Sequence, residues 1–195
     1  DGGEAEKFCF TAHEISEYAP LNENEFLVTF SYDSHTFEFA QNQDFEAIKK
    51  LDSGDFSVVS RDDSDEIWII AFERDDGPVA YYSFNRKLKK GSFLFYNKPS
   101  LNEYTLSRME EISFTSRDGL IIHGYITYPQ CKKKNNLPLV LYVHGGPWWR
   151  DTWGYNPTVQ WFASRGYACL QINYRGSIGY GKNFFDAGNR EWGGK

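Results

Sequence analysis

The sequence predicts an all-β region followed by an α/β unit, and two patterns in the 195-residue chain lead to this prediction. Up to about residue 110, short runs of alternating apolar residues are separated by clusters of Asp, Asn, Gly and Pro, which favour turns. From about residue 139 onward, two apolar runs flank one segment with helical periodicity. The first pattern is typical of antiparallel sheets, and the second is typical of a parallel sheet with a right-handed crossover.

The first region has one predicted helix among its strands. Phe45, Ile48 and Leu51 are spaced at helical intervals, and the segment ends near Gly54. The last four strands follow one another at intervals of about ten residues, which predicts one blade of a β-propeller or part of a β-sandwich. The predicted strands of this region span residues 25–32, 35–39, 56–60, 66–72, 79–84 and 92–96.

Acidic runs in the turns of this region resemble calcium-binding loops at first sight. Asp62, Asp63 and Asp65 follow one strand, and Asp75 and Asp76 follow the next. Neither run has the glycine and the distal glutamate of an EF-hand loop. We therefore predict solvated turns at both places and no metal site in the chain.

The second region opens with a predicted β-hairpin, 111–116 and 120–128, whose arms flank the strong turn signal Asp118-Gly119. The next predicted strand, 139–143, is a run of five apolar residues. Such a continuous run is typical of a strand in a parallel sheet, so we expect it to be buried on both faces.

A helix is predicted after this strand and its loop. Asn156 is a favourable N-cap residue, and Pro157 suits the first helical position. Gly166 ends the helix, and residues 167–172 form the next apolar strand. The three elements make a βαβ unit, in which ligands bind beyond the carboxyl ends of the strands, where the loop 144–156 lies.

The turn His144-Gly145-Gly146-Pro147 begins this loop. Its glycines let the backbone approach a ligand without a Cβ in the way. In α/β-hydrolases, a His-Gly-Gly turn after the third strand supplies a backbone N–H to the oxyanion hole. Pro147 has no N–H, so the donor would be Gly145 or Gly146. An ordinary Gly-Pro turn that ends a strand is the alternative interpretation.

A glycine-rich segment follows the second strand of the βαβ unit and invites two misreadings. Gly179 and Gly181 do not complete the G-x-G-x-x-G spacing of a dinucleotide-binding loop. Ser177 is not the centre of a G-x-S-x-G nucleophile elbow, because Arg175 stands where the first glycine is required. We predict a crossover into a helix over 182–188, with Arg175 in a structural ion pair or, alternatively, binding a substrate carboxylate.

Composition excludes several classes of partner. The formal net charge of −6 argues against binding to nucleic acid or to an anionic membrane surface. No apolar run approaches the roughly 20 residues that span a bilayer. The cysteines Cys9, Cys131 and Cys169 are odd in number and unremarkably spaced, which predicts free thiols and favours a cytoplasmic location.

Short motifs follow one another in order through the second region. They are Phe114-Thr115-Ser116-Arg117-Asp118-Gly119, Gly124-Tyr125, His144-Gly145-Gly146-Pro147-Trp148, Gly166-Tyr167, Asn173-Tyr174-Arg175-Gly176-Ser177, Gly179-Tyr180-Gly181 and Glu191-Trp192-Gly193-Gly194. Their ordered combination resembles the prolyl oligopeptidase family of serine peptidases, and within it the branch of the acylaminoacyl peptidases. The resemblance is dense over 111–195. Residues 25–97 resemble more loosely the last propeller repeats before the hydrolase domain.

The resemblance implies the C-terminal strands of a β-propeller over residues 1–105 and the N-terminal part of an α/β-hydrolase domain over residues 106–195. It implies hydrolysis of short peptides or acyl-peptides by a Ser-Asp-His triad, with no metal or organic cofactor. In this family the nucleophile elbow, the Asp and the His follow the motif that ends at Gly194. The triad would therefore lie beyond Lys195, and we expect the 195-residue chain alone to be inactive.

The resemblance also assigns the candidate site. The backbone N–H of Gly145 or Gly146 is the expected oxyanion donor. His144, Trp148 and Trp149 are expected to line the site, although the tryptophans would serve equally well at the interface between propeller and hydrolase.

Two other functions are also compatible with the sequence. One is a carboxylesterase or lipase, although these enzymes more often have a third glycine where Pro147 stands and lack an upstream propeller. The other is a non-catalytic propeller binding module attached to a degenerate hydrolase. The identity of the residue at the nucleophile position decides between an enzyme and such a module.

Overall fold

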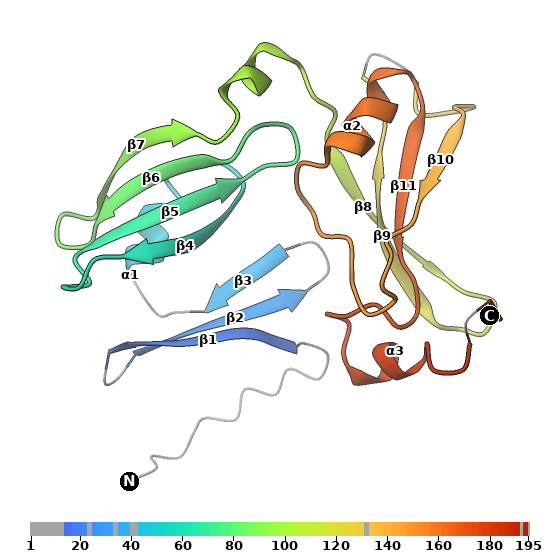
Figure 1. The fold of residues 1–195 in the computed structure, drawn as a ribbon, viewed down its shortest axis with the longest axis horizontal. Helices are drawn as coiled ribbons and strands as arrows, with labels where there is room; N and C mark the ends of the chain where they lie inside the picture. Colours follow the sequence, from blue (N-terminus) through green and yellow to red (C-terminus); the bar gives the residue numbers. More distant parts are fainter. Residues whose placement is uncertain are drawn as a thin grey trace, which may run out of the picture.

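The computed structural model describes the backbone of residues 14–22, 25–32 and 35–39 and the whole of residues 43–130, 133–191 and 193–194. These residues form three β-sheets (Figure 1). No helix among them is long and apolar enough to cross a membrane.

The first sheet contains three antiparallel strands in sequence order, and two of them were predicted. The unpredicted strand, β1, has apolar residues without strict alternation and contains Pro20, a residue that weakens a strand prediction. The strands are β1 (Glu14–Asn22), β2 (Glu25–Tyr32) and β3 (His35–Phe39).

The second sheet, called here the antiparallel sheet, has four strands in the order β4-β5-β6-β7. All four were predicted, and so was the short helix that precedes them. The elements are α1 (Gln43–Ile48), β4 (Asp55–Arg61), β5 (Ile67–Glu73), β6 (Ala80–Asn85) and β7 (Lys90–Tyr96).

One face of the antiparallel sheet is closed by α1. Trp68, Ile70 and Phe72 alternate along β5 and are fully buried, because successive residues of a strand point to opposite faces. Phe45 and Ile48 of α1 belong to the same apolar cluster. The Phe45 ring lies 6.0 Å from the Trp68 ring, centroid to centroid, which places the helix directly on the sheet.

The third sheet, called here the mixed sheet, has the order β10-β11-β9-β8. β10 and β11 pair in parallel, as the predicted βαβ unit requires, and β8 and β9 pair antiparallel, as the predicted hairpin requires. The antiparallel pairing of β9 with β11 was not predicted. The elements from the end of β7 onward are the 3₁₀ helix η1 (Pro99–Glu103), β8 (Met109–Thr115), β9 (Ile121–Thr127), β10 (Leu139–Tyr142), α2 (Pro157–Ser164), β11 (Ala168–Asn173) and α3 (Lys182–Asp186).

The start of α2 is built as the sequence indicated. The Asn156 side chain accepts hydrogen bonds from the N–H groups of Thr158 (3.0 Å) and Val159 (3.1 Å), and Pro157 occupies the first turn. Asn156 thereby satisfies two of the backbone donors that a helix leaves free at its N-terminus.

The expectation that the strand at 139–143 is buried on both faces is wrong in this structure. Leu139, Leu141 and Val143 are 54%, 55% and 50% exposed. β10 is the edge strand of the mixed sheet, and these alternate residues share one face that the described part of the chain leaves open. An apolar run predicts a strand in a sheet, but its burial depends on the neighbours on each side.

A buried polar joint connects the antiparallel sheet to the mixed sheet. Asp75, in the turn after β5, is 5% exposed, and its carboxylate accepts a hydrogen bond of 2.7 Å from the Met109 N–H. The Gln160 amide of α2 donates to the carbonyls of Ser107 (2.6 Å) and Asp75 (3.2 Å) and accepts from the Ser107 N–H (2.9 Å). α2 lies on the side of the mixed sheet that is nearer to the antiparallel sheet (Figure 1). The prediction of a solvated turn at Asp75 is therefore wrong, because this turn docks against the start of β8.

Candidate active site

The candidate site is the turn that follows β10, at the carboxyl end of a parallel strand. Gly146 has a φ of +136°, which strongly favours glycine, and a Cβ built there would lie 2.9 Å from the Trp148 nitrogen. Gly145 has open space around the position of a Cβ. The conformation of the turn therefore requires a glycine at 146 and leaves 145 sterically unconstrained.

The His144 side chain folds back over its own turn. Its Nδ1 lies 2.9 Å from the Gly145 carbonyl oxygen. Because a carbonyl only accepts, this contact places a proton on Nδ1, which donates the hydrogen bond. Its Nε2 lies 2.9 Å from the hydroxyl of buried Ser177. The imidazole is thus held at both nitrogens.

Tyr174 supports the same turn from the glycine-rich segment after β11. Its ring stacks on the His144 ring, with centroids 4.4 Å apart and an interplanar angle of 14°. Its hydroxyl donates to the His144 carbonyl oxygen at 3.0 Å. Ser177 is tied to this segment too, because its hydroxyl lies 2.6 Å from the Tyr174 carbonyl oxygen. The motif 173–177 therefore packs against the turn 144–147.

The N–H groups of Gly145 and Gly146 are available to a ligand. Within the described part of the chain, neither N–H donates a hydrogen bond to a protein acceptor. Both residues are exposed. Two free donors on adjacent peptide groups can stabilise an oxygen atom that gains negative charge.

The loop after the turn is fastened to the mixed sheet by a second set of polar contacts. Buried Asn173 accepts from the Asp151 N–H (2.7 Å) and donates to the Asp151 carbonyl (2.9 Å). Arg150 donates to the hydroxyls of Tyr125 and Tyr180, each at 3.3 Å, and its guanidinium lies 4.7 Å from the centroid of the Tyr180 ring. These contacts fix the path of the loop downstream of the glycines.

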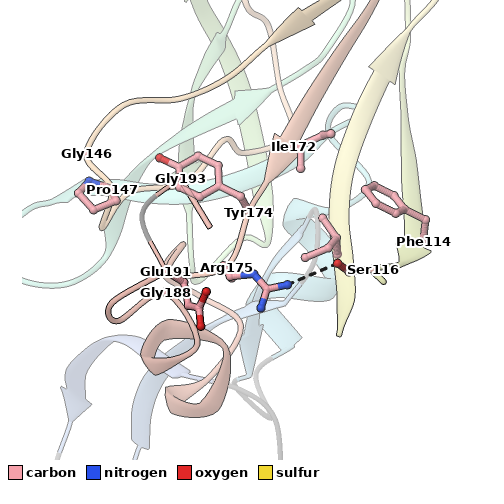
Figure 2. Close-up of a pocket in the computed structure, with 11 residues that line it drawn as sticks. Phe114, Ser116, Gly146, Pro147, Ile172, Tyr174, Arg175, Gly188, Glu191 and Gly193 are labelled. Atoms are coloured by element: carbon pink, nitrogen blue, oxygen red, sulfur yellow. Dashed lines mark hydrogen bonds between the residues drawn. The ribbon is translucent and has the colours of Figure 1, made fainter. Parts of the chain in front are cut away.

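A cavity of about 580 Å³ opens beside the turn (Figure 2). Gly146 and Pro147 form part of its wall. Its lining combines apolar side chains of the mixed sheet with Arg175 and Glu191. The lining residues are Phe114, Ser116, Ile122, Gly146, Pro147, Ile172, Tyr174, Arg175, Gly188, Glu191 and Gly193.

Arg175 has a structural partner in the turn of the β8–β9 hairpin. Its guanidinium donates to the two carboxylate oxygens of Asp118 at 2.8 and 3.0 Å, and to the Ser116 hydroxyl at 3.4 Å (Figure 2 shows the bond to Ser116). The hydrogen bonds from Arg175 hold the pKa of the Asp118 carboxyl well below its usual value. This geometry favours the ion-pair interpretation of Arg175 over binding of a substrate carboxylate.

Trp148 and Trp149 lie on the surface next to the turn. They are 56% and 63% exposed, and neither borders the cavity. The Trp148 ring is stacked on Phe185 of α3 with centroids 6.3 Å apart. Their assignment to the substrate site or to an interface stays a prediction.

Asp151, in the loop after the turn, has a partly buried carboxyl group. Burial raises its pKa, and contacts with Gln171, His144 and Arg150 offset this only in part. Its Oδ2 and the Gln171 Oε1 are buried and have no hydrogen-bond partner among the described residues. Cys169, on the same strand as Gln171, is a buried free thiol whose pKa burial raises to about 11. The other two cysteines lie outside the described residues.

The sequence analysis assigned no role to Tyr174, Asn173 or Arg150. Their functions depend on partners 22 to 30 residues away, which no local spacing reveals. Among the described residues, no group of three or more His, Cys, Asp or Glu side chains is placed to hold a metal ion. The sequence contains no G-x-S-x-G motif.

The sequence comparisons agree on one family. Residues 153–195 match the sequence profile of the prolyl oligopeptidase family. The chain is 41% identical over 159 residues to dipeptidyl aminopeptidase BIII of Pseudoxanthomonas mexicana, covering 78% of this chain and 23% of that protein. It is 32% identical over 164 residues to dipeptidyl peptidase family member 6 of Caenorhabditis elegans, covering 73% and 22%. The chain thus spans less than a quarter of the length of either relative.

Solved structures share the fold at lower sequence identity. Acylaminoacyl peptidase of Pyrococcus horikoshii superposes with a TM-score of 0.63 at 20% identity, covering 90% of this chain and 27% of that one. Dipeptidyl peptidase 4 of Porphyromonas gingivalis superposes with a TM-score of 0.67 at 13% identity, covering 93% and 27%. The solved structures thus share the fold, and the sequence relatives and the profile show that this chain belongs to the prolyl oligopeptidase family.

Proposed function

We propose that this chain provides the oxyanion-binding turn of a serine peptidase that hydrolyses short peptides or acyl-peptides. The observation that carries the proposal is the pair of free N–H groups at Gly145 and Gly146, beside a cavity and at the carboxyl end of β10. Ligands of open α/β sheets bind at this end of the strands.

The turn would act on the tetrahedral intermediate of acyl transfer. When a serine attacks the scissile carbonyl, the carbonyl oxygen becomes an oxyanion, and backbone N–H groups stabilise it. One donor would be Gly145 or Gly146, and the other would be the N–H after the nucleophile. The Ser-Asp-His triad is proposed to come from residues beyond Lys195, so the 195-residue chain alone would be inactive.

The two main sheets receive assignments under the same proposal. The antiparallel sheet would be a blade of a β-propeller that occupies residues 1–105, and the mixed sheet would be the N-terminal part of an α/β-hydrolase domain over residues 106–195. The four-stranded antiparallel meander and the parallel pairing of β10 with β11 support these assignments.

The substrate class has two candidates within the peptidases. The sequence relatives carry dipeptidyl peptidase names, which favours release of dipeptides from a free N-terminus. The structural relatives include acylaminoacyl peptidases, which favours blocked residues. Dipeptidyl and N-acyl-aminoacyl nitroanilides separate the two, because each substrate satisfies only one type of N-terminal recognition.

The first test is the coding sequence downstream of Lys195. The proposal predicts a G-x-S-x-G motif on a strand-to-helix turn within about 60 residues, followed by Asp and His. A reading frame that ends at Lys195, or an elbow with Gly or Asp at the serine position, would overturn the proposed peptidase activity. The non-catalytic binding module would then be the favoured function.

The second test is a matched pair of glycine substitutions in the peptidase that contains this chain. Gly146→Ala and Gly119→Ala both place a Cβ at a positive φ, but Gly119 lies in the hairpin turn of the mixed sheet. We expect Gly146→Ala to lower kcat by about 10²-fold or more, and Gly119→Ala to leave kcat unchanged. Equal kinetics for the two variants would refute the proposed peptidase site.

A further inference from the structure

The cavity beside the glycine turn combines three chemically different surfaces. Gly146, in the turn after β10, forms part of its wall, and Glu191, in the segment after α3, forms another part (Figure 2). Apolar side chains of the mixed sheet line it as well, namely Phe114, Ile122 and Ile172. A ligand that matches all three surfaces has an oxygen that accepts hydrogen bonds, an apolar side chain and a cationic group.

Negative charge is in excess on the Glu191 side of the cavity. Arg175 already donates to both carboxylate oxygens of Asp118, at 2.8 and 3.0 Å. These bonds hold the pKa of Asp118 well below its usual value, so this carboxyl is ionised at neutral pH. The pKa of Arg175 is raised by Asp118 and also by the charge of Glu191. One guanidinium thus faces two acidic side chains, and a cationic ligand group would complete the balance.

The segment that carries Glu191 is shaped by backbone contacts. The Glu191 N–H donates to the Gly188 carbonyl at 3.2 Å, and the Gly194 N–H donates to the Glu191 carbonyl at 2.9 Å. Gly188 packs on the backbone of Gly176, where an added Cβ would lie 2.8 Å from the Gly176 Cα. A Cβ at Gly194 would lie 2.8 Å from Glu191 Oε2, so glycine leaves room for the carboxylate there. An amide in place of the carboxylate leaves these backbone contacts intact.

We propose that Glu191 binds the N-terminal ammonium group of a dipeptidyl substrate whose scissile carbonyl lies at the glycine turn. The two residues between these groups span at most about 7 Å when extended, and the cavity of about 580 Å³ accommodates them. An N-acylated residue has no charge for Glu191 to bind, so the site would select free N-termini. The inference deepens the proposed function, because it rests on the turn receiving the scissile carbonyl.

The test uses two substrates that differ only by the ammonium group: alanyl-alanyl nitroanilide and propionyl-alanyl nitroanilide. In the complete peptidase, the wild type is expected to cleave the charged substrate with a kcat/KM about 10- to 100-fold higher, as a hydrogen bond between charged groups allows. Glu191→Gln should lower kcat/KM for alanyl-alanyl nitroanilide by about the same factor. For propionyl-alanyl nitroanilide, kcat/KM should stay within about twofold, because that substrate makes no contact with the charge.

Two further variants separate charge recognition from a structural role. Glu191→Asp keeps the charge on a shorter side chain and should keep part of the preference for the charged substrate. Glu111→Gln is the matched control: Glu111 is exposed on β8, on the opposite face of the strand from Phe114, and does not line the cavity. It should keep the whole preference. A preference that survives in Glu191→Gln, or an equal loss for both substrates, would overturn the proposal.

Binding without turnover distinguishes failure of this inference from failure of the proposed function. Calorimetric titration of the complete peptidase with alanyl-alanine and with propionyl-alanine measures recognition of the ammonium group alone. We expect the wild type to bind alanyl-alanine more tightly and Glu191→Gln to bind the two compounds equally. If neither nitroanilide is cleaved, the peptidase function fails, and the titration still tests Glu191. Equal affinities in the wild type would overturn the role of Glu191 and leave the peptidase function standing wherever the nitroanilides are cleaved.

Discussion

The strands β5 of the antiparallel sheet and β10 of the mixed sheet consist almost entirely of apolar residues, yet the two strands are buried to different extents. Along β5, Trp68, Ile70 and Phe72 are fully buried against α1. Along β10, Leu139 and Leu141 are more than half exposed. The strand sequences differ little in apolar content, so the difference arises from position: β5 is an inner strand with a helix on one face, and β10 is an edge strand. Apolar pattern identifies a strand, and topology decides whether it is core.

Two alanine substitutions, one at a buried and one at an exposed position, test this difference in burial. The buried one has the largest expected effect on stability. Trp68→Ala removes a buried ring, the 2.6 Å bond from its Nε1 to Asp65 and the contact with Arg86 at 4.4 Å, and is expected to lower the free energy of unfolding by about 3–5 kcal/mol. Leu141→Ala is expected to change it by about 0.5 kcal/mol or less. Urea unfolding followed by tryptophan fluorescence and circular dichroism measures both. Similar losses for the two variants would show that the exposed face of β10 is covered in solution.

The joint between the two sheets should have an intermediate effect. Gln160→Leu keeps the size of the side chain but leaves the buried N–H and carbonyl of Ser107 without partners, so we expect a loss of about 1–3 kcal/mol in the free energy of unfolding. Gln130→Leu is the control, since the exposed Gln130 also donates to a backbone carbonyl, that of Leu106. If Gln130→Leu costs as much as Gln160→Leu, burial is not what gives the joint its strength.

The smallest expected effect is a gain of stability inside the mixed sheet. The pKa of Asp151 is raised in the folded chain, so its contribution to stability is fully present below the unfolded pKa of about 3.9 and is lost as the pH rises through the folded pKa. Asp151→Asn removes this dependence and offers an N–H₂ to the unpartnered Gln171 Oε1. We expect the variant to be about 1 kcal/mol more stable than the wild type at pH 7, and the gain to vanish near pH 3. A variant less stable at pH 7 would mean that Arg150 and His144 stabilise the buried anion.

Local chemistry was sufficient to predict most of the secondary structure. The strands of the antiparallel sheet, the β8–β9 hairpin and the N-cap at Asn156 all depend on residues close together in the sequence, and the structure confirms them. The sequence singled out Gly145 and Gly146 together, because glycines allow a close approach of the backbone, and the structure shows that Gly146 is the one with a positive φ.

Burial and hydrogen bonds that depend on residues far away in the sequence could not be predicted. The exposure of Leu141 depends on β10 being an edge strand, and the burial of Asp75 depends on where β8 begins. The role of Tyr174 depends on a hydroxyl that meets a carbonyl 30 residues earlier in the chain. In each case the residue type is compatible with several environments, and the tertiary fold selects one.

The joint at Gln160 depends on side chains that bind backbone groups and not other side chains. Among the described residues, the Gln160 side chain hydrogen-bonds only to backbone groups of Ser107 and Asp75, and the Asp75 carboxylate hydrogen-bonds only to the backbone N–H of Met109. At this joint, the two side chains therefore recognise the path of the main chain and not the side chains of Ser107 and Met109. A substitution at position 107 or 109 keeps these hydrogen bonds as long as the new side chain fits the buried space there. Hydrogen bonds from a side chain to backbone groups thus hold the two sheets together at this joint with little demand on the residue types that supply those backbone groups.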